Sequence, residues 1–219
     1  RPNDRIPFPF ASGRIVHFCP TATSIAPEVT TVPKSESVED RRVQRTRDAL
    51  HSAFMALLKE REWEQIRVQD ICDRANVGRS TFYNHYVDQE GLLSGSLSEL
   101  GVYVKSAYGN RPDAPDLWFA RGLFDHVLVN EEMFRKLQGS HSGAVVKDRF
   151  CQLAIMLARD CLAAKGIKNP RLDAGAAFLG GAFIELLAWY VNARKRPSVD
   201  GLEAMFLDMG RSALESIQA

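Results

Sequence analysis

The chain has 219 residues, of which 45% are apolar and 25% charged, and its formal net charge is +1. This composition is ordinary for a soluble globular protein, and the length allows one large domain or a small domain joined to a larger one. A net charge this small excludes a uniformly basic chain, so any attraction for nucleic acid has to come from a local cluster of basic residues.

The cysteines and histidines predict neither a metal site nor a cofactor. The four cysteines form no CxxC motif and lie at no metal-ligand spacing from a histidine. They are Cys19, Cys72, Cys151 and Cys161. Scattered thiols of this kind are typical of a cytoplasmic protein. The five histidines form no nucleophile–base arrangement with Cys, Asp or Glu in the sequence, which argues against an enzyme.

The first segment of the chain, residues 1–39, differs in composition from the rest. Six prolines break regular structure there, with serines and threonines between them, so the segment is predicted to be a tail or arm. From residue 40 onward apolar residues repeat at helical spacing, and no run alternates as a strand does. The sequence therefore predicts an all-α fold.

The first helical elements are predicted in quick succession. An amphipathic helix around residues 43–58 precedes a short helix at 68–75. Asn76, which tolerates the left-handed backbone of a sharp turn, then interrupts the chain before a third helix at about 78–86. Asp88 is predicted to cap a long fourth helix.

The remainder of the chain predicts about five more helices. Their expected ranges are 116–130, 131–138, 144–165, 170–194 and 198–217. The most apolar stretch, residues 174–191, carries Glu185 and is followed by a basic run. That pattern is marginal for a membrane span and favours a helix buried between other helices.

The second and third helices carry the functional signal. Two short helices joined by a tight turn, the second rich in hydrogen-bonding side chains, are typical of a helix-turn-helix. Ile71, Ala75, Val77 and Phe82 can fill the small core between them, which leaves the polar side chains of the second helix to project outward. These are Arg79, Ser80, Thr81, Tyr83, Asn84 and His85. Arginine can bond guanine bidentately, asparagine can pair with adenine, and hydroxyls can reach phosphates.

The run Thr81-Phe-Tyr-Asn-His-Tyr86, followed by Asp88-Gln-Glu-Gly-Leu-Leu93 and preceded by an amphipathic helix, resembles the DNA-binding domain of the TetR family of transcription regulators. The resemblance covers about residues 41–100. It implies a symmetric dimer whose third helices enter successive major grooves of duplex DNA. It also implies that Thr81, Tyr83 and His85 hold the phosphate backbone, while base edges face Arg79, Ser80 and Asn84.

Basic residues outside the third helix extend this predicted interface. Four arginines crowd residues 41–47, and beside a helix-turn-helix such a cluster indicates an electrostatic footprint for DNA. Arg45 and Arg67 are predicted to contact the phosphate backbone.

The C-terminal half carries a second resemblance. The run 177–191, Ala-Phe-Leu-Gly-Gly-Ala-Phe-Ile-Glu-Leu-Leu-Ala-Trp-Tyr-Val, then Pro197 and a final amphipathic helix, is similar to TetR relatives grouped with dihydroxyacetone-kinase regulators. In that group the last two helices of each subunit form an intersubunit four-helix bundle. Gly175, Gly180, Gly181 and Ala182 would let helices approach closely. The implied organisation is an arm (1–39), a DNA-binding domain (40–88) and a larger regulatory and dimerisation domain (89–219).

The resemblance further implies a small-molecule effector held inside the second domain. Eight residues are predicted to line its pocket, with ordinary core packing as the alternative for each. They are Phe119, Leu123, Phe124, Phe134, Phe150, Phe183, Glu185 and Trp189. Glu185 is a carboxylate on an apolar helix, so it needs a partner, which could be a ligand cation, an arginine or the dimer interface.

The sequence thus predicts a cytoplasmic, homodimeric transcription regulator, acting as a repressor on a palindromic operator and released by a small effector. The alternative is a helical ligand-sensing or protein-interaction module whose helix-turn-helix has degenerated. Two departures from the TetR pattern favour that alternative: Gly78 stands where a capping serine is usual, and Gln89 where a lysine is common.

Overall fold

A computed structural model describes residues 38–111 and 113–218 of the chain. The arm predicted at residues 1–39, together with Cys19, therefore lies outside the described residues except for its last two positions. Those two positions already belong to the first helix, α1 (Val38–Leu58), so the helical part begins two residues earlier than the sequence predicts.

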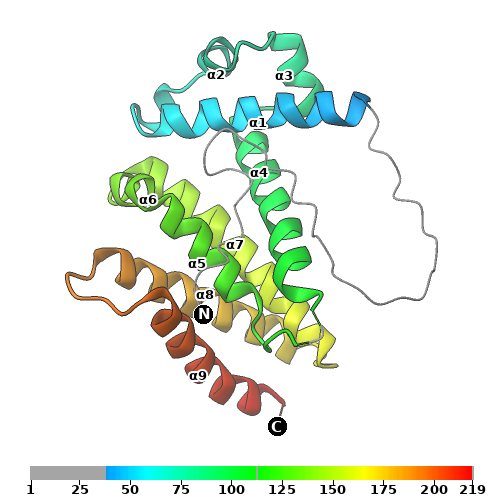
Figure 1. Cartoon of the computed structure of the whole chain (residues 1–219), viewed down its shortest axis with the longest axis vertical. Coiled ribbons are helices and arrows are strands. Elements are labelled where there is room, and N and C mark those ends of the chain that lie inside the picture. The colour runs from blue at the N-terminus through cyan, green and yellow to red at the C-terminus, as the bar shows by residue number, and fades with distance from the viewer. Residues whose placement is uncertain (1–37, 112, 219) are drawn as a thin grey trace, which may run out of the picture.

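The described part of the chain is built from helices and contains no strand, which confirms the all-α prediction. At one end of the molecule α1 lies beside α2 and α3, and α4 leads from there into the remaining helices (Figure 1). After α1 the helices are α2 (Val68–Ala75), α3 (Arg79–His85), α4 (Gln89–Val104), α5 (Phe119–Val129), α6 (Glu131–Leu137), α7 (His141–Ala164), α8 (Arg171–Asn192) and α9 (Val199–Gln218). A short 3-10 turn (Trp63–Gln65) precedes α2, and α4 ends in a π-helical turn (Lys105–Gly109).

The first four helices share a hydrophobic core. Leu50 and Phe54 of α1, Ile71 of α2, Phe82 of α3 and Leu92 of α4 are all fully buried in it. The same core includes side chains from α6 and α7: Met133, Leu137 and Val146. The first four helices therefore pack directly against α6 and α7.

A second, larger core joins α5, α7, α8 and α9. Four phenylalanine rings meet at its centre, with the tilted ring of Phe124 lying 4.6 Å from that of Phe183 and Phe206 lying 5.4 Å from Phe183. Phe119 contacts Phe183 edge-on at 5.7 Å. A Cβ at Gly180 would lie 2.7 Å from the backbone nitrogen of Ile155, so this glycine permits the close approach of α8 to α7.

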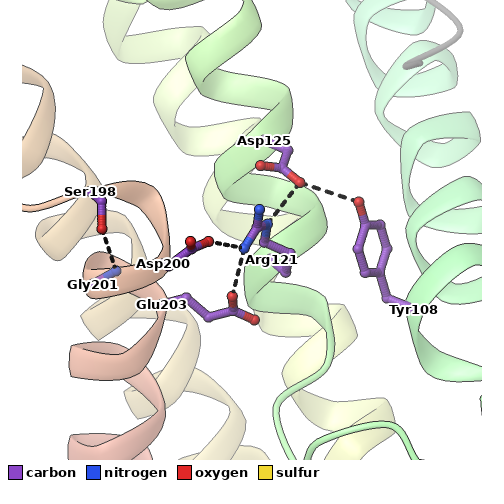
Figure 2. Close-up of polar contacts among 7 residues, drawn as sticks. All are labelled: Tyr108, Arg121, Asp125, Ser198, Asp200, Gly201 and Glu203. Carbon is purple, nitrogen blue, oxygen red and sulfur yellow. Dashed lines mark hydrogen bonds and ion pairs between the residues drawn. The ribbon is translucent and has the colours of Figure 1, made fainter. Parts of the chain in front are cut away.

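An ionic network fixes α9 against α5. Arg121 of α5 contacts Asp200 at 2.7 Å and Glu203 at 3.0 Å, both on α9, and Asp125 on its own helix at 3.0 Å (Figure 2). The hydroxyl of Tyr108, from the π-helical turn, donates to the same Asp125 at 3.3 Å. Arg121 and Asp125 together therefore link the turn after α4 to α5 and α9.

Helix α8 is, by length and composition, apolar enough to cross a membrane, and half of its most apolar window is buried inside the molecule. Its buried residues, including Leu179, Phe183 and Leu187, belong to the larger core. One apolar helix packed in this way is weak evidence for a membrane span, since a core helix passes the same test of length and composition.

Candidate nucleic-acid interface

The turn between α2 and α3 is built by local backbone chemistry. The Asp70 carboxylate accepts a hydrogen bond from the Arg67 backbone N–H at 2.8 Å, which satisfies a donor at the start of α2. Asn76 ends that helix in the left-handed conformation, with φ 53° and ψ 47°, as the sequence predicts. Gly78 is the N-cap of α3 and provides no side-chain hydrogen bond.

Inward-facing residues hold the two helices together. Ile71 and Phe82 are fully buried, and Phe82 packs 5.9 Å from the ring of Tyr86. Ala75 and Val77 are partly buried beside this core. Burial also raises the pKa of the Tyr86 phenol to about 12, with the nearby Glu99 carboxylate adding to the shift. Tyr86 is therefore a core residue and remains neutral at physiological pH.

The polar residues of α3 lie on the opposite side. Arg79, Ser80, Tyr83 and Asn84 are exposed, whereas Thr81 and His85 are partly buried. All six side chains of the predicted DNA-contacting set on this helix thus reach the surface of the molecule. The pKa of the His85 imidazole is lowered by burial and by the positive charge of Arg47, so the ring is held in its neutral form.

Basic side chains of α1 and of the loop before α2 are also exposed. Arg41, Arg42, Arg45 and Arg67 are exposed, and no ion pair joins any of them to another described residue. Other basic residues of this region are neutralised by acids. Arg61 lies 3.4 Å from Asp70, and Arg74 lies 2.8 Å from Glu60. Positive charge that no acid neutralises therefore lies on these four exposed arginines. Two of them, Arg45 and Arg67, are the predicted phosphate contacts.

The remaining arginine of the cluster has a structural contact. Arg47 forms an ion pair with Glu99 of α4 at 3.3 Å. This ion pair holds α1 against α4. Arg47 is partly buried, whereas Arg45 is exposed.

Gln89, which replaces the lysine usual in the TetR pattern, has an internal contact. In the amide orientation that pairs both of its groups, the Gln89 oxygen accepts a hydrogen bond from Trp63 Nε1 at 2.9 Å and its NH2 group donates one to the Ile66 carbonyl at 2.7 Å. The indole of Trp63 also packs edge-on against Phe54 at 5.5 Å. The departure at position 89 therefore fastens the α1–α2 loop to the start of α4. Sequence spacing gave no signal for it, because the contact joins residues 26 positions apart.

Two curated relatives match parts of the chain. An uncharacterised HTH-type transcriptional regulator, YxbF of Bacillus subtilis, is 44% identical over 61 residues, which are 27% of this chain and 16% of that protein. DhaS of Lactococcus lactis, an HTH-type transcriptional activator of the dhaKLM operon, is 41% identical over 49 residues, which are 22% of this chain and 26% of DhaS. The chain thus matches about a quarter or less of the length of these relatives. No family model matches the chain.

Solved structures cover more of the molecule. A TetR transcriptional regulator from Streptococcus agalactiae is 29% identical, with a TM-score of 0.54 over 79% of this chain and 97% of that one. The chain has the TetR fold. The dihydroxyacetone kinase operon activator DhaS shares this fold at 18% identity, with a TM-score of 0.54 over 78% of this chain and 96% of DhaS.

Among the described residues, one cavity lies between α6, α7 and α8 and another lies between α1, α4 and the helices that follow α4, and most of the predicted effector residues line neither. Phe134 and Phe150 border both of them. Phe119, Leu123, Phe124 and Phe183 are instead fully buried in the larger core. Glu185 and Trp189 are exposed, and the partner that Glu185 requires is Lys147, at 2.7 Å. These six residues line neither of the two cavities, and their assignment to an effector pocket stays a prediction.

The outer face of α8 and α9 is apolar and uncovered in the single chain. Phe178, Trp189, Met205 and Met209 are between 41% and 61% exposed. Gly181 lies on this face as well, since a Cβ there would have no atom within 4 Å. Large apolar side chains gathered on one face are typical of an interaction surface.

Proposed function

We propose that the chain is a homodimeric, sequence-specific DNA-binding transcription regulator in which α3 enters the major groove. The observation that carries the proposal is the exposed polar face of α3, held on a buried core by Ile71 and Phe82. A helix of this size, presented by a helix-turn-helix, fits the width of the major groove. The two curated relatives and the Streptococcus agalactiae structure, all three transcription regulators by name, support the same function.

Within this interface the side chains divide by chemistry. Arg79, Ser80 and Asn84 are exposed along α3 and are proposed to read base edges. Thr81, Tyr83 and His85 are proposed to hold phosphates. Tyr83 offers a hydroxyl, and the neutral ring of His85 offers one N–H donor. Arg45 and Arg67 would add charge contacts to the flanking phosphates.

The dimer is proposed to form through α8 and α9. Their exposed apolar face would be covered by the same face of a second copy, which is the self-complementary arrangement of a two-fold dimer. In Figure 1 these helices lie at the far end of the molecule from α2 and α3, so pairing there leaves both α3 helices free. A two-fold dimer reads a palindromic site with half-sites about one or more DNA turns apart.

The remaining parts of the proposal follow from this role. The regulator would work in the cytoplasm, with the arm, the DNA-binding unit and the regulatory domain divided near residues 40 and 88. No enzymatic activity is proposed. Repression stays a prediction. The relative DhaS is an activator by name, so the direction of regulation is to be read from a promoter–reporter assay with and without the chain.

Selection of duplexes from a random library with the purified full chain tests the proposal. The expected result is one enriched, two-fold symmetric motif that binds with a dissociation constant well below that of a shuffled duplex. Enrichment of no motif would favour the alternative, a helical sensing or interaction module with a degenerate helix-turn-helix.

A further inference from the structure

One arginine of the basic cluster at residues 41–47 is held by an acid where α1 meets α4. Arg47 Nη1 lies 3.3 Å from Glu99 Oε1, and the two side chains are 40% and 28% exposed. This distance is longer than the about 2.7–2.9 Å that is usual for a charge-assisted hydrogen bond between a guanidinium and a carboxylate. Because the contact is long and partly open to water, we expect the pair to exchange partners readily.

The ion pair lies next to the end of α3. Tyr86, the residue that follows this helix, packs on α4, since a Cβ at Gly95 would lie 2.8 Å from Tyr86 Cε1. Glu99 is one helical turn beyond Gly95 and therefore lies on the same side of α4. The His85 ring lies 6.2 Å from the Tyr86 ring, and the positive charge of Arg47 contributes to lowering the pKa of His85. Arg47 is therefore close to a residue that is proposed to hold a phosphate.

The guanidinium is incompletely satisfied in this position. Arg47 Nε is buried and forms no hydrogen bond with a described residue, although an arginine has five N–H donors. A second carboxylate of the same cluster, Asp48, accepts a hydrogen bond from the Gln44 amide at 3.0 Å. Burial raises the pKa of the Glu99 carboxyl, while the charge of Arg47 acts in the opposite direction. Burial thus weakens the hold of the acid on the guanidinium.

A DNA phosphate could offer Arg47 more than Glu99 does. Phosphate oxygens can bind a guanidinium through two parallel hydrogen bonds. The exposed arginines of the same cluster form no ion pair with another described residue. They are Arg41, Arg42 and Arg45. Within the part of the cluster that the structure describes, Arg47 therefore differs in having an acid where a phosphate could bind.

We propose that Glu99 is a positioning residue that holds Arg47 away from the phosphate backbone and thereby limits the affinity of the chain for duplex DNA. Phosphate contacts carry no sequence information directly, so the limit applies to operator and unrelated DNA alike. The inference deepens the proposed function, on which it rests. Glu99 does not contact DNA in this arrangement and acts only through Arg47.

Fluorescence anisotropy of the full chain with operator and shuffled duplexes tests the release of Arg47. Glu99→Gln removes the charge that holds Arg47 and keeps the size of the side chain. Affinity for both duplexes should rise about threefold or more at low salt, and the slope of log affinity against log salt should become steeper by about one. The gain should shrink about threefold between roughly 50 and 200 mM salt, because each phosphate contact contributes about 0.9 to the slope.

Two comparisons separate the release of Arg47 from the mere loss of an acid. Asp73→Asn removes an exposed carboxylate of α2 whose partner is the neutral amide of Gln69, at 2.6 Å. Its salt slope should stay at the parent value. The second comparison is between Arg47→Met and the double variant that also carries Glu99→Gln. Without Arg47, removal of the acid should change the affinity less than twofold and leave the slope unchanged.

NMR relaxation of the arginine Nε–H groups tests the restraint without DNA. In the free parent chain the order parameter of Arg47 should be clearly higher than that of the exposed Arg45. In Glu99→Gln it should fall to the level of Arg45, and saturating operator should raise it again. Circular dichroism shows whether each variant is folded. If Glu99→Gln is not, Glu99→Leu, which is uncharged and of similar size, takes its place in both measurements.

Three results would overturn the inference. They are an Arg47 side chain as mobile as Arg45 in the free parent chain, a parent-like salt slope for Glu99→Gln, and a gain in affinity that persists without Arg47. A parent chain that binds no duplex would instead refute the proposed function. The relaxation measurement would still decide whether Glu99 restrains Arg47.

Discussion

The guanidinium of Arg79 lies over the ring of Tyr83, one helical turn later on α3, with its Cζ 5.9 Å from the ring centroid. Tyr83 is half exposed and is itself supported edge-on by the buried ring of Phe82 at 5.5 Å. The attraction between a guanidinium and an aromatic ring restricts the conformations of the arginine side chain before it binds DNA. The most flexible side chain of the proposed recognition helix is thus partly oriented by the helix that carries it.

Arg79→Ala should weaken binding to the selected operator by about 1–3 kcal/mol, because a base-reading arginine would be removed. The same change should relax sequence preference at one position of each half-site. Arg74→Ala is the matched control, since Arg74 is paired with Glu60 at 2.8 Å and lies on α2. Fluorescence anisotropy with operator and shuffled duplexes measures both variants. Equal losses for the two arginines would contradict the assignment of α3.

Arg45→Ala should act differently, because Arg45 is predicted to contact phosphate. Affinity should fall for operator and shuffled DNA alike, and the slope of log affinity against log salt should become shallower by about one. Arg61→Ala removes an arginine that Asp70 already neutralises at 3.4 Å, and its salt slope should stay at the parent value. If both variants show the parent slope, the proposed footprint does not include α1.

The helix-turn-helix could be predicted from the sequence because its determinants are local. Asn76 marks the turn by a backbone preference that few residues share, and its left-handed φ is the one positive value among non-glycine residues of the described chain. The apolar positions Ile71 and Phe82 face inward at helical spacing, which leaves Arg79 and Asn84 outside. No long-range contact is needed for either inference.

The residues that line the cavity between α6, α7 and α8 could not be predicted, because they differ from core residues only in what packs on them. The rings of Phe124 and Phe183 lie 4.6 Å apart in the core, while Phe134 borders a cavity, and the sequence pattern is the same for all three. The Trp63–Ser142 hydrogen bond joins residues 79 positions apart. Such a pairing depends on how the start of α7 packs against the α1–α2 loop. The periodicity of apolar residues does not predict this packing.

Phe178→Glu should convert the proposed dimer into a monomer. Phe178 is 61% exposed on the apolar face of α8, and a carboxylate placed in the centre of a two-fold interface would be buried without a partner. The dissociation constant of the dimer should rise by roughly 100-fold or more. Val102→Glu, on the exposed side of α4, is the matched control and should leave the mass unchanged. Analytical ultracentrifugation distinguishes the two. A dimer that survives Phe178→Glu would place the interface elsewhere.

Two adjacent glycines of α8 should respond to alanine in opposite directions. At Gly180 a Cβ would lie 2.7–2.8 Å from backbone atoms of Ile155, so α7 and α8 would have to separate, at a cost of about 1–3 kcal/mol. In the single chain the Cβ at Gly181 would meet open space, so in the monomeric Phe178→Glu background alanine should gain up to about 1 kcal/mol from its helix propensity. Urea unfolding of both variants measures the difference. Equal stabilities would show that the close approach of α8 to α7 is not as tight as described.

Buried histidines should make the fold less stable as the pH falls. His51 of α1 contacts the Ser96 hydroxyl of α4 at 2.7 Å, and burial lowers the pKa of its ring to about 4, from 6.5. His126 lines the same small cavity, and burial lowers its pKa to about 3, with the proximity of His51 adding to the shift. Both rings are therefore neutral in the folded chain at pH 7.

The sign of the effect follows from the unfolded state. Below pH 6.5 the unfolded chain takes up protons at His51 and His126 that the folded chain does not, so stability is complete above pH 6.5 and declines toward pH 4. Between pH 7 and pH 5, His51 alone should account for a loss of about 1–2 kcal/mol. His51→Gln should flatten the dependence of the free energy of unfolding on pH by that amount. Ser216→Ala, an exposed change on α9 that removes no titratable group, should leave the slope unchanged. Urea unfolding at half-unit pH steps gives the slopes, and a parent-like slope for His51→Gln would mean that the ring is already accessible to protons in the folded chain.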